Sequence, residues 1–354
     1  MACVTTAWQG LDADLAAQAA ERDASGSVLL TRRGEVLFEG CYGLADRACG
    51  VPVTPATRFG LASVTKMFTA VAVADQVNAG ALSLEDRVVD LVPPGSRPST
   101  LHPGVALSHL LLHTSGIADY AEEDEDTPGY VEDYASLWVD RPSYSMLRPI
   151  DFLPLFGDRP PYRPPGERWQ YSNAGYVLLG IVLEHVTGRA YVDLVQERVF
   201  DRAGMTSTGF LRLDEPHPDV AVAYLDPEVP GGPRRTNIYS IPVIGGADGG
   251  AMSTPRDLSR FLDRVADGSL MGPLTDVMLD PREEIGGGNG YRHAYGFFHD
   301  DVGAFGHGGG DPGVSCVADR FAADDANLVA LCNVEGWLGE LYGEVLRTWR
   351  EAGP

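Results

Sequence analysis

Lysine is nearly absent from this chain. Of its 27 lysine and arginine residues all but Lys66 are arginine, and 50 acidic residues outnumber them to give a net charge of −23. A chain this acidic is repelled by the phosphates of nucleic acids and by anionic membrane surfaces. We therefore expect neither nucleic acid nor a membrane among its partners.

Cysteine and long hydrophobic runs are scarce as well. The cysteines contain no CxxC pair, and an odd number without that spacing favours reduced, mostly buried thiols over a disulfide framework. No stretch approaches the roughly 18 apolar residues of a membrane span, and the first residues have neither the basic nor the apolar region of a signal peptide. We therefore expect a cytoplasmic protein. The cysteines are Cys3, Cys41, Cys49, Cys316 and Cys332.

The composition is that of a folded protein. With 354 residues, of which 44% are hydrophobic, the chain can build one large domain or two interleaved ones. Residues 27–40 predict a hairpin with an Arg-Gly turn, and residues 294–334 predict four short strands. We expect an α/β fold of the α+β kind, in which residues 1–90 and 240–354 form a sheet domain from both ends of the chain.

Helical patterns occupy much of the remaining chain. Residues 91–239 are expected to form a mainly helical insert. Residues 92–165 are rich in proline and acidic residues, with the run EEDED and scattered aromatic residues, so we expect loops and short helices outside the core, above all in the loop-rich segment 118–165. The segments with helical character are 11–24, 64–79, 176–186, 191–199, 257–268 and 337–350.

Lys66 is a candidate general base. Where only a solvated positive charge is needed, arginine can replace lysine, so a codon bias can remove nearly every surface lysine. Arginine stays protonated in proteins, whereas a desolvated lysine amine can lose its proton near neutral pH. The position that keeps lysine is therefore one where a proton has to leave.

Ser63 lies three residues before Lys66, in the stretch LASVTKMFTA. Residues three apart share one face of a helix, so the two side chains come within hydrogen-bond reach. A serine becomes a nucleophile when a base lies beside it, and a helix N-terminus favours a developing oxyanion. The same pattern also fits a helix cap beside a surviving surface lysine, so SxxK by itself leaves both interpretations open.

Two further stretches complete a set of motifs. WQYSNAGY contains Tyr171 and Asn173, and FGHGGGDPG places His307, Gly308 and Gly309 at the end of a predicted strand. With LASVTKMFTA before them, they resemble in order the three motifs of the serine β-lactamase and penicillin-binding protein superfamily. LLLHTSGI and GADGGAMSTPRDLSRFL are also similar to stretches of the class C β-lactamase, D-alanyl-D-alanine carboxypeptidase and family VIII esterase branch. The resemblance implies a β-lactamase-like fold, an antiparallel sheet flanked by helices, with the active site between the sheet and the helical insert.

The resemblance also implies roles for the first two motifs. Ser63 would be the nucleophile that forms an acyl-enzyme. Lys66 and Tyr171 would share the base work, with the pKa of the tyrosine drawn down by the neighbouring ammonium. Which of the two removes the serine proton stays open, because their titrations are coupled.

The remaining motif residues would hold the substrate. Asn173 would hydrogen-bond Lys66 and the amide or ester of the substrate. The backbone N–H groups of Ser63 and Gly310 would form the oxyanion hole. Glycines suit this strand because a substrate carbonyl can approach a backbone without side chains. The other residues expected to orient the substrate are His307, Gly308 and Gly309.

His307 departs from the family pattern. In β-lactamases and carboxypeptidases the third motif usually begins with lysine, whose full charge meets the substrate carboxylate, whereas histidine is only partly charged near neutral pH. We therefore expect a serine hydrolase for a small ester or amide that lacks a required carboxylate, with weak β-lactamase activity at most. Residues 118–165 would either cover the acyl pocket and favour cationic substrates or form a solvated surface loop.

Other functions fit the same residues. An acyltransferase of secondary metabolism would use the same mechanism, and a D-amino-acid peptidase or carboxypeptidase would differ only in substrate. In a non-catalytic binding homologue, Tyr171 would be a core aromatic residue, Asn173 a helix cap and His307 a buried structural histidine. The oligomeric state stays open.

Three other kinds of site find little support. We interpret HTSG at residues 113–116 as a tight turn, not as part of a second catalytic triad. The absence of GxSxG argues against an α/β-hydrolase. His293, His299 and His307, with the acids at 300–301, match no established ligand spacing, so we expect no metal and no cofactor.

Overall fold

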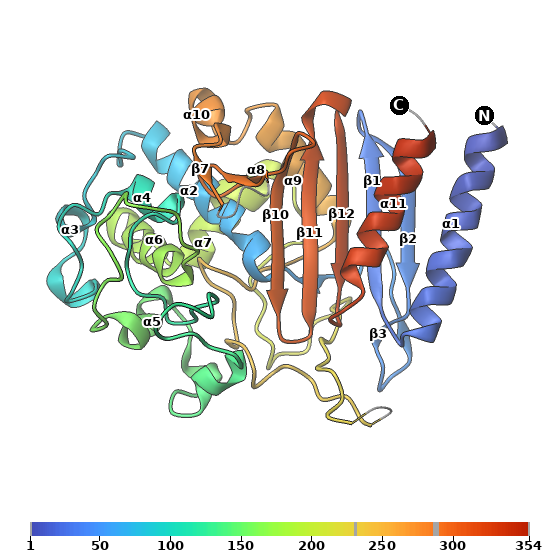
Figure 1. The fold of residues 1–354 in the computed structure, drawn as a ribbon, viewed down its shortest axis with the longest axis horizontal. Helices are drawn as coiled ribbons and strands as arrows, with labels where there is room; N and C mark the ends of the chain where they lie inside the picture. Colours follow the sequence, from blue (N-terminus) through green and yellow to red (C-terminus); the bar gives the residue numbers. More distant parts are fainter. Residues whose placement is uncertain (1, 230–231, 286–289, 353–354) are drawn as a thin grey trace.

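The computed structural model describes residues 2–229, 232–285 and 290–352. Within these ranges one antiparallel sheet runs through the molecule in the strand order β2-β1-β12-β11-β10-β9-β8-β7 (Figure 1). Its long strands are β1 Gly26–Arg32, β2 Glu35–Tyr42, β10 Ala304–Asp311, β11 Val314–Phe321 and β12 Ala326–Cys332. Short strands extend it: β7 Glu283–Glu284, β8 Arg292–His293 and β9 Phe298–His299. Two small pairs lie apart from it, β3 Leu44–Asp46 with β4 Val51–Pro52 and β5 Phe59–Gly60 with β6 Met252–Ser253.

The two ends of the chain meet inside this sheet. Strand β1 pairs with β12, with Gly26 opposite Cys332. It continues into β2 through Arg33 and Gly34, which both have the positive φ that a two-residue hairpin turn requires. The predicted antiparallel sheet with strands from both ends of the sequence is therefore confirmed.

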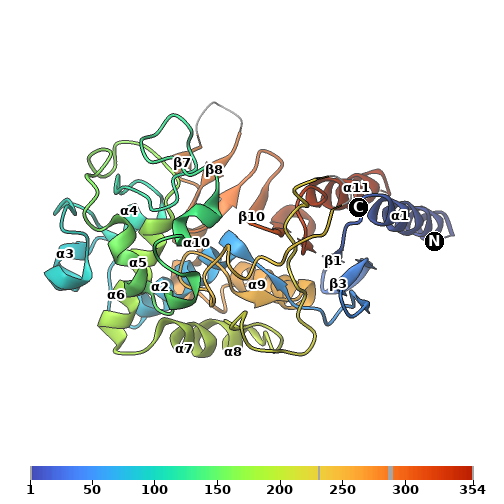
Figure 2. The ribbon, with the colours of Figure 1, turned by 90° about the horizontal axis from the view of Figure 1, so that it is seen from below.

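Helices cover both faces of the sheet. α1 Ala2–Glu21 and α11 Leu338–Ala352 lie side by side over one face, where Leu341 and Trp349 enter an apolar cluster with residues of β1 and β12. α9 Pro255–Ala266 packs on the opposite face (Figure 2). The Thr254 side chain caps α9 by accepting a hydrogen bond from the backbone N–H of Asp257.

A second and larger core surrounds α2 Lys66–Asn78 and α6 Asn173–Thr187. Most residues of α2 and of α6 are buried, as expected for helices that other elements enclose on every side. Around them lie α3 Val88–Leu91, α4 Leu107–Leu111, α5 Pro149–Phe156, α7 Tyr191–Val195, α8 Asp201–Ala203 and α10 Thr275–Leu279. Short 3-10 helices are η1 Ala62–Thr65, η2 Pro94–Ser96, η3 Tyr134–Trp138, η4 Ser143–Ser145, η6 Gly272–Leu274 and η7 Ala322–Asp324, and η5 Gln196–Phe200 is a π-helix.

The segment 118–165 contributes to this core, contrary to the sequence prediction. Tyr120, Trp138 and Phe152 are buried, and the ring of Phe152 lies 5.6 Å from that of Tyr120 and 6.3 Å from that of Trp138. The indole N–H of Trp138 donates to the carbonyl of Ser240 at 2.9 Å. The proline-rich composition hid these contacts because the rings anchor irregular backbone, which has no periodic pattern. The domain boundaries near residues 90 and 240 stay a prediction.

The structure bears on two expectations, the absence of a membrane span and the state of the cysteines. No helix in the described part of the chain is both long enough and apolar enough to cross a membrane. The four cysteines whose side chains are described are free thiols: Cys316 and Cys332 are buried, Cys41 is partly buried and Cys49 is exposed. The side chain of Cys3 lies outside the described part.

Candidate active site

Ser63 lies in a strained turn at the wall of a large cavity. It belongs to the 3-10 turn η1, and α2 begins three residues later, so the predicted helix edge is a separate tight turn. Ala62, directly before it, has a φ of +41°, a conformation that costs an alanine free energy and that surrounding contacts must hold. The N–H of Gly250 donates to the Ala62 carbonyl at 3.2 Å and contributes to that restraint.

The amine of Lys66 makes three close polar contacts. The side chain is fully buried, and Nζ lies 3.0 Å from Ser63 Oγ, 2.7 Å from Asn173 Oδ1 and 2.5 Å from the Asp248 carbonyl oxygen. The last two oxygens can only accept hydrogen bonds. A neutral amine would satisfy both with its two protons and point its lone pair at Ser63. The geometry therefore suits transfer of the serine proton to Lys66.

The hydroxyl of Tyr171 contacts the same oxygen. It donates to Ser63 Oγ at 2.6 Å, and the Lys66 amine lies 4.9 Å from the centre of the tyrosine ring, a cation–π contact. Ser63, Lys66 and Tyr171, here called the candidate catalytic group, are thus brought together as predicted. Asn173, the first residue of α6, joins them through its contact with Lys66.

The pKa shifts of Lys66 and Tyr171 have opposite consequences. Burial lowers the pKa of Lys66 from its usual value, although the carboxylates of Asp248 and Glu123 oppose the shift. Burial also raises the pKa of Tyr171 well above its usual value, and the charge of Glu123 adds to this rise. The predicted lowering of the Tyr171 pKa is therefore wrong: loss of solvation and the charge of Glu123 outweigh the hydrogen bond with Ser63, which lowers the pKa. At neutral pH the tyrosine is a proton donor.

Two acidic residues that received no role from the sequence hold this group in place. Asp119 is buried, and its carboxylate accepts the N–H groups of Asn173 at 2.7 Å and Ala174 at 2.9 Å at the start of α6. Asp248 offers its carbonyl to Lys66, while its carboxylate accepts a short hydrogen bond from the Tyr120 hydroxyl. Both lie in or beside stretches that resemble the family, which was the available signal. Side-chain capping of α6 falls to Ser172, so the alternative of Asn173 as a cap is wrong.

Strand β10 passes directly beside the nucleophile. A Cβ atom at Gly309 would lie 2.6 Å from the Leu61 carbonyl oxygen and 3.0 Å from the Ser63 nitrogen, so only glycine allows this approach. Gly310 has open space around it and lines the cavity together with Ser63, and its role as the second oxyanion-hole donor stays a prediction. In the described sheet, β10 pairs with β9 only at Phe305 and Gly306, so its edge beyond them faces η1.

His307, Gly308 and Gly309 do not line the cavity. The His307 ring is buried against Phe298, with 4.5 Å between ring centres. Burial lowers the pKa of His307 to about 3, and the charge of Lys66 contributes, so the ring is neutral at physiological pH. It offers no cation for a substrate carboxylate.

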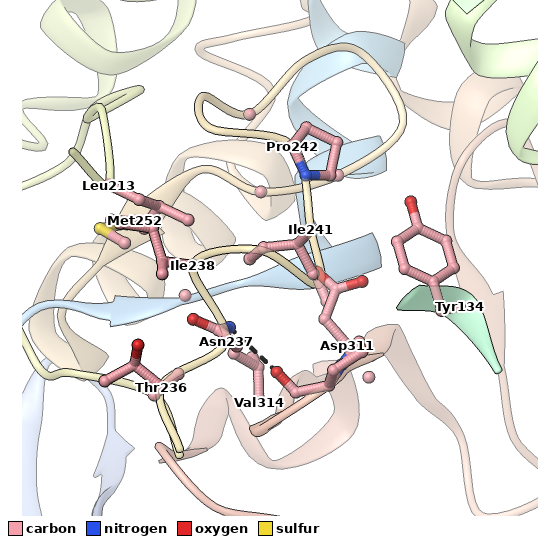
Figure 3. Close-up of a pocket in the computed structure, with 18 of the residues that line it drawn as sticks. Tyr134, Leu213, Thr236, Asn237, Ile238, Ile241, Pro242, Met252, Asp311 and Val314 are labelled. Atoms are coloured by element: carbon pink, nitrogen blue, oxygen red, sulfur yellow. Dashed lines mark hydrogen bonds between the residues drawn. The ribbon is translucent and has the colours of Figure 1, made fainter. Parts of the chain in front are cut away.

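The cavity has a volume of about 1270 Å³ and a strongly acidic lining. Figure 3 shows Asp311 and Tyr134 along it, with the apolar residues Ile238, Ile241 and Val314 nearby. Its carboxyl residues are Asp46, Glu123, Glu132, Asp133, Asp214, Glu215, Asp248, Asp311 and Glu335. Arg212 is the one arginine in the described lining, and it pairs with Asp214 and Glu215. Those of these carboxyl groups that are ionised repel an anionic substrate.

Glu123, Asp248 and Asp311 form the part of the lining that faces the candidate catalytic group, and we call them the carboxyl wall. All three act on the Lys66 amine through their charge. Glu123 also accepts a hydrogen bond from Asn173 Nδ2 at 3.3 Å, and it alone of the run EEDED lines the cavity. Burial raises the pKa of Asp311 to about 7, although the charge of Lys66 opposes this.

The chain resembles known proteins over most of its length. The family model described as Beta-lactamase matches residues 11–340. The chain belongs to the β-lactamase family. This confirms both the resemblance drawn from the three motifs and the β-lactamase-like fold, and it places the chain among serine hydrolases.

Relatives of this β-lactamase family member include enzymes and penicillin-binding proteins. It is 28% identical to penicillin-binding protein 4* of Bacillus subtilis over 326 residues, 88% of this chain and 68% of that protein. It is 36% identical to esterase EstB of Burkholderia gladioli over 203 residues, 55% of this chain and about half of EstB (49%). The structure of a penicillin-binding protein from Bacillus halodurans superposes with a TM-score of 0.86, at 32% identity, and covers 94% of this chain and 98% of that one. D-amino acid amidase of Ochrobactrum anthropi shares the fold, with a TM-score of 0.76 at 24% identity over 99% of both chains.

Proposed function

We propose that this chain is a serine hydrolase that forms an acyl-enzyme at Ser63 from a small ester or amide. One observation carries the proposal: Ser63 Oγ lies at a cavity wall, 3.0 Å from the amine of a buried lysine and 2.6 Å from a tyrosine hydroxyl. A nucleophile, a base and a proton donor within hydrogen-bond reach are the parts that acyl transfer needs. The kinship with esterase EstB supports an ester, and the fold shared with D-amino acid amidase is compatible with an amide.

In the proposed mechanism Lys66 is the base for acylation. Its neutral amine takes the proton of Ser63, and the serine oxygen attacks the substrate carbonyl. The N–H groups of Ser63 and Gly310 stabilise the resulting oxyanion, an interaction whose loss costs about 3 kcal/mol of barrier. Tyr171 then gives its proton to the leaving group and regains one from Lys66. Water releases the acyl group by the same steps in reverse order, which restores Ser63.

The preferred substrate carries no carboxylate near the scissile bond. His307 is neutral and buried, and the carboxyl wall repels anions, so nothing at this end of the cavity would hold the carboxylate of a penicillin. The same charges favour a substrate with a protonated amine. A matched panel tests this, namely activated esters of one shape bearing an ammonium, a neutral or a carboxylate group. We expect kcat/KM to fall in that order, and nitrocefin turnover comparable to that of dedicated β-lactamases would contradict the proposal.

The nucleophile is tested with a fluorophosphonate probe and peptide mass mapping. We expect one modified residue, Ser63, and no modification in Ser63→Ala. Ser115 of the HTSG turn is the internal control, because it is buried and has no lysine beside it in the sequence. Labelling of Ser115 at the rate of Ser63 would refute the assignment.

The size of the cavity supports a second candidate, transfer of the acyl group to an alcohol or amine. A cavity of about 1270 Å³ exceeds the roughly 300–1,000 Å³ of common small-molecule sites, so an acyl donor and an acceptor fit together. Turnover of an activated ester with added alcohols and amines distinguishes the two reactions. If the ratio of acylated acceptor to hydrolysed product far exceeds the molar ratio of acceptor to water, the protein is a transferase.

A further inference from the structure

Three buried histidines lie behind Tyr171, and none of them lines the cavity. His113, His293 and His307 are 1%, 0% and 2% exposed, and we call them the histidine layer. The ring centre of His113 lies 4.5 Å from that of Tyr171 and 4.8 Å from that of His293. The ring of Phe298 lies 4.7 Å from that of His293 and 4.5 Å from that of His307. The layer thus spans from the second motif to the third.

Four ring nitrogens in this layer have no hydrogen-bond partner among the residues that the structure describes. They are Nε2 of His113, both nitrogens of His293 and Nε2 of His307. A buried polar atom left without a partner costs about 1–3 kcal/mol, so such atoms are rarely left single and are commonly joined by ordered water. Four such atoms therefore lie within one layer of buried rings.

The backbone fixes the proton position at both ends of the layer. Nδ1 of His113 accepts the N–H of Ser172 at 3.0 Å, so a neutral ring carries its proton on Nε2. Nδ1 of His307 lies 2.5 Å from the Gly308 carbonyl oxygen, which can only accept, so here the proton is on Nδ1. Burial lowers the pKa of all three rings, which keeps them neutral. The remaining nitrogen of His113, Nε2, is therefore a hydrogen-bond donor, and the remaining nitrogen of His307, also Nε2, is an acceptor.

We propose that these histidines form a directed hydrogen-bond chain, His113 to His293 to His307, completed by buried water, that positions the second motif against the third. A neutral His293 has one donor and one acceptor, and it fits between the two ends in one orientation. The residues act by positioning and do not touch the reacting atoms. This chain of histidines rests on the proposed hydrolase function only in the experiment that measures labelling of Ser63.

Each end of the chain is attached to a part of the active site. At one end the His113 carbonyl accepts the Gln170 N–H at 2.8 Å, so His113 holds the backbone on both sides of Tyr171. Its φ of +56° is a strained conformation that the surrounding contacts maintain. At the other end His307 precedes Gly309, whose strand lies against Ser63. The chain would thus set the distance between the Tyr171 hydroxyl and the oxyanion strand.

A metal ion is a poorer occupant of the layer than water. Within the described ranges no three histidine, cysteine or acidic side chains are placed to hold a metal ion. His299 provides a control: it also has an unpartnered Nε2, but its ring pairs with Phe305 at 5.9 Å and it acts on His293 only through its charge. It neighbours Phe298 in β9, so a substitution there perturbs the same strand.

The protonation pattern is testable on the wild-type chain. Long-range ¹H–¹⁵N correlation spectra of protein labelled at histidine distinguish the two neutral forms of each ring. We expect the proton on Nε2 of His113 and on Nδ1 of His307 at pH 7. The opposite form at either end would overturn the chain. This measurement needs no substrate, so it stands even if the proposed hydrolase activity fails.

The positioning role is tested at the middle ring. Gln keeps one donor and one acceptor, whereas Phe fills the ring volume with neither. We expect His293→Phe to slow labelling of Ser63 about tenfold, the effect of one well-placed hydrogen bond, and His293→Gln to stay within about twofold of wild type. His299→Phe should change nothing. If folded His293→Phe and His293→Gln label Ser63 at equal rates, the layer acts through packing alone, which contradicts the proposal.

Discussion

The two sides of the candidate catalytic group differ in charge. In front of it the carboxyl wall borders an open cavity, and three acidic side chains face one lysine. Behind it the histidine layer is closed, buried and neutral. Both sides contain ionisable residues: burial raises the pKa of the wall carboxyl groups, that of Asp311 to about 7, and lowers the pKa of the three histidines.

This difference explains how Lys66 can serve as a base. Burial disfavours the ammonium form, and the charges of the carboxyl wall favour it. A second set of carboxylates behind Tyr171 would keep the amine protonated, whereas neutral rings on both sides would leave no attraction for a cationic substrate. The neutral histidine layer therefore allows Lys66 to act as a base, and the carboxyl wall favours a cationic substrate.

The largest expected effect comes from Lys66→Arg, which removes the base while keeping its charge. Arginine stays protonated and cannot take the serine proton. We expect labelling of Ser63 by the fluorophosphonate to fall about 10³-fold or more. The matched control is Arg87→Lys, the reverse exchange in an exposed ion pair with Asp90, which should not change the rate. If Lys66→Arg retains a tenth of the wild-type rate of Ser63 labelling, Lys66 is not the base.

Tyr171→Phe should have the next largest effect, and its size should depend on the leaving group. The tyrosine keeps its proton because burial raises its pKa, so it serves as a proton donor. We expect kcat/KM for an amide to fall about 10²-fold, the usual contribution of a general acid, and for an aryl ester about tenfold, since a phenolate leaves without help. Equal losses for both substrates would indicate that the hydroxyl only holds Ser63 in place.

The sequence predicts the part of this site that depends on local spacing and ordered motifs. Ser63 and Lys66 are three residues apart on a turn and helix, and the structure places their polar atoms 3.0 Å apart. The pKa of Tyr171 was not predictable in this way. Its sign depends on how completely the ring is buried, a sum over side chains distant in the sequence.

The supporting residues escaped prediction for the same reason. His113 belongs to a stretch that the sequence presents as a tight turn, and nothing in HTSG shows that its ring faces Tyr171 and His293. Asp119 likewise accepts backbone N–H groups of a helix that begins more than fifty residues later. Partners for buried polar atoms are chosen by the tertiary fold, whereas motif spacing reports only on neighbours in one element.

A change at Asp311 should separate charge from shape in the carboxyl wall. Its pKa of about 7 means that the carboxyl is protonated and neutral below pH 7 and ionised above it. We expect the preference for an ammonium ester over its neutral analogue to rise about fivefold between pH 6 and pH 8, within the range of a partly screened ion pair. Asp311→Asn should remove this rise and keep turnover of the neutral ester. If the preference for the ammonium ester still rises with pH in Asp311→Asn, another group causes the rise.

The smallest expected effect distinguishes two neighbours in the run EEDED. Both side chains are exposed, but Glu123 lines the cavity and contacts Asn173, whereas Glu125 does not line the cavity. Both substitutions to glutamine remove one negative charge, so long-range attraction changes equally in each. We expect Glu123→Gln to raise KM for the ammonium ester about threefold and Glu125→Gln to leave it unchanged at 0.15 M salt, where a charge beyond about 8 Å is screened. If both variants shift KM alike, the acidic segment acts through its total charge, and the carboxyl wall does not select the substrate by contact.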